Sequence, residues 1–197
     1  QIPIPEHLGK DIIADAISPQ KDVDGLGGVN VKLLWENKKG GFVPATTKGI
    51  LSLLAYYNIP VAGKRVVVVG RSFLVGKPTA HALLNADATV TIAHSKTENL
   101  SDITRAADIV VVATGKPHFI QRNDVREGQV IIDVGITAVT GEKLDDEVPE
   151  TTIAGDVHFD DVKDIVAAIS PVPGGVGPMT VASLFQNLVE AYEKQQK

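Results

Sequence analysis

The feature that most constrains this chain is a series of short β-branched runs between residues 65 and 134. The first run, Arg65–Val69, is uninterrupted and is closed by Gly70, which is typical of a strand buried on both faces of a parallel sheet. Further strands are predicted at Thr89–Ala93, Ile109–Val112, Val130–Val134 and near Ile169, with helices through His81–Leu84 and at Leu100–Ala106. Strands that alternate with helices at this spacing indicate βαβ units. We therefore expect an α/β fold with a Rossmann-type, doubly wound parallel sheet.

The segments that precede this region are expected to be helical. Residues 10–17 have apolar side chains at helical spacing, and Val31–Trp35 is a short apolar patch that also favours a helix. Thr46–Gly49 is expected to cap a helix that runs through Ile50–Tyr57.

The pattern changes at Gly63-Lys64, where we expect a domain boundary. Residues 61–177 are predicted to form a dinucleotide-binding Rossmann domain. Residues 1–60 and 178–197 are predicted to form part of a second, smaller α/β domain. The helix at Thr46–Asn58 and the last helix are expected to join the two domains.

The composition argues against several classes of partner. The net charge of −5 gives no support for nucleic-acid binding, which needs a basic face. The chain has no cysteine, so disulfides and thiolate metal sites are excluded and we expect no metal site. No apolar run approaches the roughly 20 residues of a membrane span. We expect a cytoplasmic protein without a nucleic-acid or membrane partner.

The loop Gly70–Gly76 lies between the first predicted strand and its helix. In a Rossmann fold this position holds a pyrophosphate against the amino terminus of the helix. The spacing departs from G-x-G-x-x-G, so the prediction depends on the buried strand before the loop and the helix after it. A simple strand-to-helix turn is the alternative.

The end of the second predicted strand favours NADP over NAD. An NAD site places a carboxylate about 20 residues beyond the loop, on the ribose 2′-hydroxyl. This chain has Ala93–Lys96 there, without an acidic residue. A carboxylate would repel a 2′-phosphate, whereas Arg71, Ser95 and Lys96 can attract one.

The segment Pro171–Thr180 reads Pro-Val-Pro-Gly-Gly-Val-Gly-Pro-Met-Thr. Gly174 and Gly175 let the backbone approach a flat ligand closely, because no Cβ intervenes. The prolines stiffen the loop, and Pro178 is expected at the first position of a helix. Such a loop predicts one wall of a ligand site, with an ordinary tight connection as the alternative.

Together these segments resemble the bifunctional methylenetetrahydrofolate dehydrogenase/cyclohydrolase family. Pro171–Thr180 resembles its C-terminal signature, and Gly70–Gly76 resembles its cofactor motif. Lys21–Gly25 resembles its pterin-binding turn, and Gln1–Pro5 resembles its Gln-Leu-Pro-Leu-Pro segment. The resemblance runs from Gln1 to about Asn187.

The resemblance implies a set of site residues. For the cofactor, NADP, these are Thr46, Gly70, Arg71, Ser72, Gly76, Ser95 and Ile136, with Ile136 at the nicotinamide end. For the folate substrate they are Asp24, Pro173, Gly174 and Gly175. Gln1 and Asp24 match catalytic positions. Residues 155–157 match a further block of the family, although His158 differs from the usual acid.

The implied activity is the oxidation of 5,10-methylenetetrahydrofolate with NADP⁺, followed by hydrolysis of the methenyl product to 10-formyltetrahydrofolate. The implied assembly is a homodimer. The family's catalytic lysine lies in a Tyr-x-x-x-Lys motif, whereas Tyr56 and Tyr57 are followed at that distance by Pro60 and Val61. We therefore expect a fragment without the catalytic lysine. The alternatives are a module that only binds NADP and an unrelated Rossmann dehydrogenase.

Overall fold

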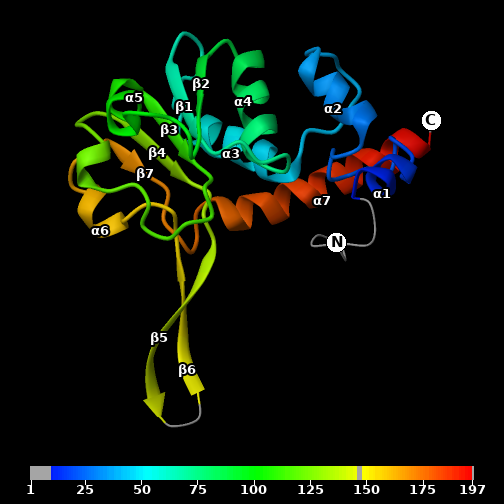
Figure 1. Cartoon of the computed structure of the whole chain (residues 1–197). Helices are drawn as coiled ribbons and strands as arrows, with labels where there is room; N and C mark the ends of the chain where they lie inside the picture. Colours follow the sequence, from blue (N-terminus) through cyan, green and yellow to red (C-terminus); the bar gives the residue numbers. More distant parts are fainter. Residues whose placement is uncertain (1–9, 146–147, 197) are drawn as a thin grey trace.

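The structure is a computed structural model that describes residues 10–145 and 148–196. Figure 1 shows a parallel sheet flanked by helices, a long final helix and a projecting hairpin. In chain order the elements are α1 (Lys10–Ala16), α2 (Gly28–Trp35), α3 (Ala45–Tyr56), β1 (Arg65–Val69), α4 (Gly76–Asn85), β2 (Thr89–Ala93), α5 (Leu100–Ala106), β3 (Ile109–Val112), η1 (Arg122–Asp124), β4 (Val130–Asp133), β5 (Thr137–Asp145), β6 (Val148–Ala154), α6 (Phe159–Val162), β7 (Ala168–Ile169) and α7 (Val176–Gln195).

The central sheet has the strand order β2-β1-β3-β4-β7, and every neighbouring pair is parallel. The chain moves to one side of β1 to form β2 and then to the other side for β3. The order therefore reverses between β1 and β3, and in open α/β sheets ligands bind at such a switch point, outside the carboxyl ends of the strands. The expected doubly wound parallel α/β sheet is confirmed.

The sheet is buried on both faces, as the β-branched runs predict. Val66 and Val68 of β1 belong to a buried cluster that includes residues of α3 and α4. Val67 and Val69 belong to a second cluster, with residues of α5 and α6. Alternate side chains of one strand thus meet helices on opposite faces.

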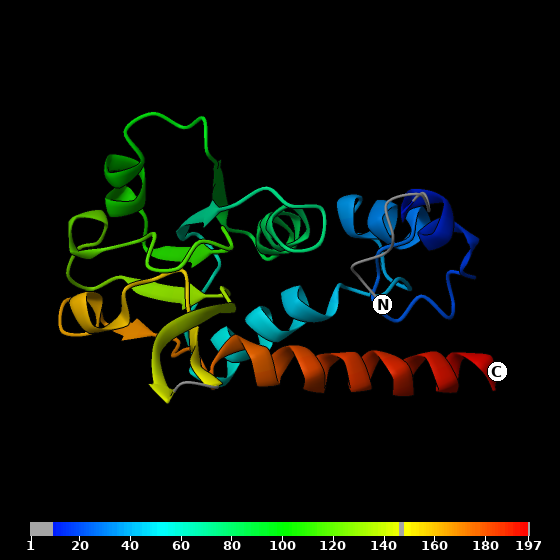
Figure 2. The same ribbon diagram turned by 60° about the horizontal axis from the view of Figure 1, so that its bottom comes forward.

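The final helix connects the sheet to the amino-terminal helices. Gly49 of α3 lies against the α7 backbone, where a Cβ would be 3.0 Å from the Met179 carbonyl carbon. Beyond this crossing α7 continues past the sheet toward α1 and α2 (Figure 2). The Asn187 side chain there donates hydrogen bonds to the carbonyl oxygens of Val23 (2.8 Å) and Val43 (2.9 Å).

The antiparallel pair β5–β6 forms a hairpin that projects from the carboxyl side of the sheet (Figure 1). The sequence analysis does not predict this hairpin. Its segments have no continuous apolar run, so they lack the pattern that identifies a buried strand.

Three boundaries differ from the sequence-based expectations. Helix α3 begins at Ala45 after Pro44, so Thr46–Gly49 lies inside the helix and does not cap it. Helix α7 begins at Val176, which places Pro178 third in the helix. Proline is tolerated there because the first-turn N–H groups have no intrahelical partner. Strand β4 ends at Asp133, one residue early.

The described residues on either side of the sheet region form helices. They are α1, α2 and α3 before it and α7 after it. The division into domains at Gly63 and Gly177 stays a prediction. No helix in the described ranges combines the length and the apolar character needed to cross a membrane.

Candidate functional site

The loop after β1 is closely packed at both of its glycines. Gly70 has φ +133°, and a Cβ there would overlap the Ala113 carbonyl group at the end of β3. A Cβ at Gly76 would overlap the backbone of Gly70 and come within 2.8 Å of Arg71 N. The loop therefore folds back on itself in the way expected of a dinucleotide loop, although its spacing is unusual.

Ser72 fixes the start of the helix that follows. Its Oγ accepts hydrogen bonds from the N–H groups of Val75 and Gly76, both at 3.2 Å. Ser72 is exposed, as is Arg71. The loop thus presents a hydroxyl and a guanidinium beside the positive end of the α4 dipole, which suits an anionic ligand.

Ser95 lies in the neighbouring loop, after β2. The Gly70 N–H donates to the Ala93 carbonyl oxygen (2.8 Å), so the loops after β1 and β2 start side by side. The His94 N–H donates to Thr97 Oγ1 (2.8 Å), which closes the second loop into a tight turn. Ser95 and Arg71 therefore project from adjacent loops, as a site for a 2′-phosphate requires.

Ile136 and the glycine-rich segment meet at the other side of the switch point. They line one pocket of about 150 Å³ together with Ile153 and residues 133–135. Ile136 is 63% exposed, and Gly175 packs against Pro171 and Ser170. The structure thus brings the residue expected at the nicotinamide end next to Pro173–Gly175, expected on the folate side.

Thr46 approaches the same segment from α3. Thr180 Oγ1 of α7 lies 3.4 Å from Thr46 Oγ1 and also donates to the Val176 carbonyl oxygen (3.1 Å). Thr47 faces the other way and forms a buried 3.0 Å hydrogen bond with Thr79 of α4. Of these adjacent threonines, Thr46 is the one that lies beside the signature helix.

Asp24 lies in a turn that is held by its neighbours. Asp22 is buried and accepts hydrogen bonds from Gly27 N (2.8 Å) and Asn30 Nδ2 (2.7 Å), whereas Asp24 is exposed. Asp24 does not line the pocket at Ile136. The turn is bonded to α7 at Asn187, eleven residues beyond Val176, which is about 16 Å along the helix.

Two buried aspartates, which we call the Asp133–Asp156 cluster, were given no role by the sequence analysis, although Asp156 lies in the block 155–157 that matches the family. Asp133 accepts hydrogen bonds from the N–H groups of Gly135 (2.9 Å), Asp156 (3.0 Å) and Val157 (2.9 Å). Burial, reinforced by the Asp156 carboxylate, raises the pKa of Asp133 against the effect of those bonds. In the sequence, each of these aspartates lies within two residues of a glycine, Gly135 and Gly155 respectively.

Asp156 is bonded to a different loop. Its Oδ2 accepts hydrogen bonds from the N–H groups of Thr114 and Gly115, after β3. Its Oδ1 is buried and has no hydrogen-bond partner among the described residues. Ser170, at the end of β7, exchanges hydrogen bonds with the Asp133 backbone. The cluster therefore ties together the carboxyl ends of β3, β4, β6 and β7.

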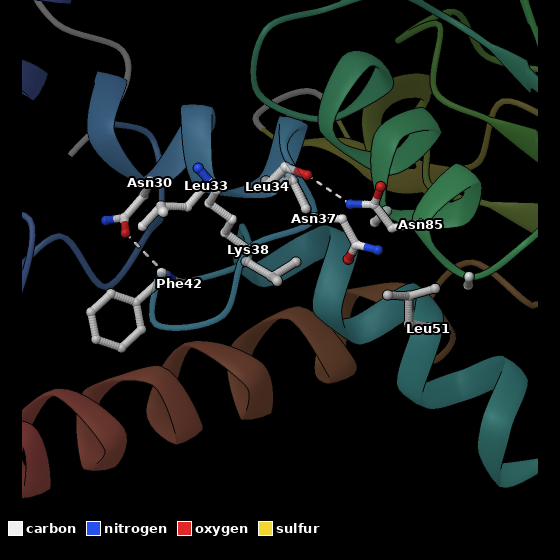
Figure 3. Close-up of a pocket in the computed structure, with 12 residues that line it drawn as sticks. Asn30, Leu33, Leu34, Asn37, Lys38, Phe42, Leu51 and Asn85 are labelled. Atoms are coloured by element: carbon white, nitrogen blue, oxygen red, sulfur yellow. Dashed lines mark hydrogen bonds between the residues drawn. The ribbon is translucent and has the colours of Figure 1, made fainter.

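A larger pocket, of about 280 Å³, lies between α2, α3 and α4 (Figure 3). Asn85 Nδ2 donates to the Leu34 carbonyl oxygen (2.7 Å), and Asn30 Oδ1 accepts from Phe42 N (3.1 Å). None of the expected cofactor or substrate residues lines it. We therefore place the candidate site at the carboxyl edge of the sheet. Gln1 lies outside the described residues, and the assigned roles of the other site residues stay predictions.

Known proteins share this architecture. The sequence profile of the family described as tetrahydrofolate dehydrogenase/cyclohydrolase, NAD(P)-binding domain, matches residues 44–196. The chain is 47% identical over 195 residues to the bifunctional protein FolD of Lactococcus lactis subsp. lactis (strain IL1403), which is 99% of this chain and 65% of that protein.

Solved structures of proteins with the same description have a similar fold. The bifunctional FolD enzyme from Campylobacter jejuni matches with a TM-score of 0.92 at 42% identity, over 99% of this chain and 66% of that one. The Trypanosoma brucei enzyme, which is complexed with NADP cofactor and an inhibitor, also has a TM-score of 0.92, at 40% identity, over 100% of this chain and 66% of that one. The chain thus spans 65% of the Lactococcus relative's length. With a match over most of its residues, this chain belongs to the tetrahydrofolate dehydrogenase/cyclohydrolase family.

Proposed function

We propose that this chain is the NADP-binding part of an enzyme that oxidises 5,10-methylenetetrahydrofolate to 5,10-methenyltetrahydrofolate and hydrolyses the product to 10-formyltetrahydrofolate. The observation that carries the proposal is the pocket shared by Ile136 and Pro173–Gly175. There the expected nicotinamide end of the cofactor and the expected folate wall meet at the carboxyl edge of the sheet, beside β4 and β7.

The residues around the first loop fit NADP. Gly70 and Gly76 let the loop pack on Ala113 and fold back on itself at the place where a pyrophosphate would approach the start of α4. Arg71 and Ser95 project from adjacent loops and would bind the 2′-phosphate. The Trypanosoma brucei relative is complexed with NADP, which supports the same cofactor here.

When bound, NADP⁺ supplies the hydride acceptor. The chain's own contribution is orientation, because hydride transfer depends on the relative placement of two flat rings. The backbone at Gly174 and Gly175 allows the folate to lie close to the loop. Asp24, in the turn that is bonded to α7 at Asn187, would accept two parallel N–H bonds from the aminopyrimidine edge of the pterin.

The hydrolytic step needs a polarising lysine, with Gln1 beside it, and this chain has no Tyr-x-x-x-Lys sequence. We therefore infer that the chain by itself binds NADP and lacks cyclohydrolase activity. That inference keeps open the second candidate function, an NADP-binding fragment without catalysis. Hydrolysis of methenyltetrahydrofolate, followed by absorbance with this chain and with the bifunctional Lactococcus lactis relative at equal concentration, tests it. Comparable rates would contradict the inference.

The assembly we propose is a cytoplasmic homodimer that serves one-carbon metabolism, including purine and amino-acid biosynthesis. The hairpin β5–β6 supports a dimer, since an isolated two-stranded hairpin is marginally stable in water and this one projects from the sheet (Figure 1).

The proposed cofactor is tested by calorimetric titration with NADP⁺ and NAD⁺. We expect tighter binding of NADP⁺. Substitution Arg71→Ala should cost about 1.5–3 kcal/mol of NADP⁺ binding, the value of a charge-assisted hydrogen bond, and leave NAD⁺ binding nearly unchanged. Arg122→Ala, an exposed arginine in η1, is the matched control. Equal affinities for the two dinucleotides would refute the assignment.

A further inference from the structure

The Asp133–Asp156 cluster has no part in the roles proposed above, although it joins loops that surround the candidate pocket. Both carboxylates are almost completely buried, at 3% and 0% exposure. Burying a carboxylate is costly unless hydrogen bonds compensate, and two neighbouring carboxylates add a repulsion. Apolar residues of similar size would often hold loops together at least as stably. The free-energy cost of burying both carboxylates indicates that the cluster has a role other than stabilising the fold.

The carboxylates lie directly against glycine backbone. A Cβ at Gly135 would overlap the Asp156 carboxylate, and a Cβ at Gly155 would overlap the Asp133 carboxylate. Gly135 immediately precedes Ile136, at the rim of the pocket. A shift of the Asp156 side chain would therefore be transmitted to the backbone at Ile136.

Asp156 also holds the loop that follows the neighbouring strand β3. Its Oδ2 accepts the N–H groups of two consecutive residues, Thr114 and Gly115. Ala113, just before them, has the carbonyl group on which Gly70 rests, and its own N–H bond to the Val69 carbonyl oxygen (2.8 Å) holds it to β1 without Asp156. One carboxylate thus sets the separation between the loop after β3 and the loop after β4.

We propose that Asp156 is a positioning residue for the nicotinamide half of the cofactor. It acts through the backbone of Thr114, Gly115 and Gly135, and Asp133 keeps it in place. The proposal rests on the proposed NADP-binding function. Arg71 and Ser95 follow β1 and β2, and the cluster's side chains make no hydrogen bond to those loops in the described residues. The adenosine half of the dinucleotide should therefore bind independently of Asp156.

Calorimetric titration with two ligands tests this division. NADP⁺ has both halves, whereas adenosine 2′,5′-bisphosphate has only the half expected at Arg71 and Ser95. Asp156→Ala should weaken NADP⁺ binding by about tenfold or more, because two charge-assisted hydrogen bonds are lost. Binding of adenosine 2′,5′-bisphosphate should stay within about twofold of wild type.

Two further variants separate positioning from other effects. Asp156→Asn keeps an oxygen that can accept both N–H groups, so NADP⁺ affinity should return to within about threefold of wild type. Asp124→Ala is the matched control, since Asp124 also accepts a backbone N–H, that of Gln121 (2.9 Å), in the same part of the chain. It should leave both ligands unaffected.

Hydrogen exchange of the ligand-free protein tests the loop directly. In Asp156→Ala the amides of Thr114 and Gly115 should exchange faster than in wild type, while those of residues 70–76 should not change. If Asp156→Ala does not fold, Asp156→Ser replaces it, because the shorter hydroxyl cannot span both N–H groups.

The outcomes are distinct. Equal weakening of both ligands, unchanged NADP⁺ binding, failure of Asp156→Asn to restore it, or unchanged exchange at Thr114 and Gly115 would each overturn the positioning role. A wild-type chain that binds neither ligand would contradict the proposed function itself, whatever the exchange experiment shows.

Discussion

At the scale of single residues, Asn187 joins segments that are far apart in the sequence. Its amide donates to the carbonyl oxygens of Val23 and Val43, and its Oδ1 accepts from Lys48 Nζ (2.9 Å). The side chain is 1% exposed, and all three bonds are partly buried. Asn187 therefore holds the turn that carries Asp24 against α7.

We expect Asn187→Leu to lower the free energy of unfolding by about 2–3 kcal/mol, because two partly buried carbonyl groups lose their donor and Lys48 loses an acceptor. Urea unfolding followed by circular dichroism measures the change. Gln186→Leu, an exposed amide on the same helix, is the control and should change stability by less than about 0.5 kcal/mol. Similar losses in both variants would show that the bonds of Asn187 contribute little.

At the scale of elements, the β1–α4 connection depends on backbone contact as well as on backbone conformation. Gly70 and Gly63 both have positive φ, at +133° and +72°. A Cβ at Gly70 would overlap the Ala113 carbonyl group, whereas a Cβ at Gly63 would have no atom within 4 Å. Alanine substitutions at the two positions therefore separate the effect of conformational strain from that of steric contact.

Gly70→Ala should displace the loop after β1 and weaken NADP⁺ binding by at least about tenfold. Gly63→Ala introduces only the strain of a positive φ and should lower stability by about 1 kcal/mol with unchanged NADP⁺ affinity. Thermal unfolding and calorimetric titration of both variants give the comparison. The account of the loop fails if Gly70→Ala binds NADP⁺ as wild type does.

At the scale of the whole molecule, α7 presents an apolar stripe to solvent. The stripe consists of Val181, Phe185, Leu188, Val189 and Tyr192, each more than half exposed. Their spacing places them on one face of the helix. Exposed apolar patches of this kind promote association, and the stripe lies apart from the pocket at Ile136.

We expect this chain to self-associate in a concentration-dependent way through the stripe. Sedimentation velocity should show a larger average mass at higher concentration, and the double substitution Phe185→Ser with Tyr192→Ser should reduce it. Phe119→Ser removes an exposed aromatic side chain from a different surface and should leave the association unchanged. A chain that stays monomeric over the same range would exclude this role for the stripe.

Much of the fold could be predicted because its signals are local. A β-branched run such as Arg65–Val69 is typical of a strand buried on both faces of a parallel sheet, and Gly70 ends it. The hairpin β5–β6 could not be predicted in the same way, because its strands do not form part of a core. Local patterns place the ends of helices less accurately than they identify the helices, as the position of Thr46–Gly49 inside α3 shows.

The candidate site also contains residues that local sequence patterns identify and residues that they do not. The sequence identifies Gly70, Gly76 and the glycine-rich segment because a side chain at these positions would obstruct the backbone. Each glycine also stands in a short motif of neighbouring residues that can be recognised without the structure. The sequence alone thus determined the doubly wound sheet, the position of its dinucleotide loop and the family. Only the tertiary structure decided that Asp133 and Asp156 share one buried cluster and that Asn187 anchors the turn of Asp24. Those contacts join residues that are far apart in the chain. Their contribution to the free energy depends on how deeply the polar groups are buried, and a local sequence pattern does not contain that information.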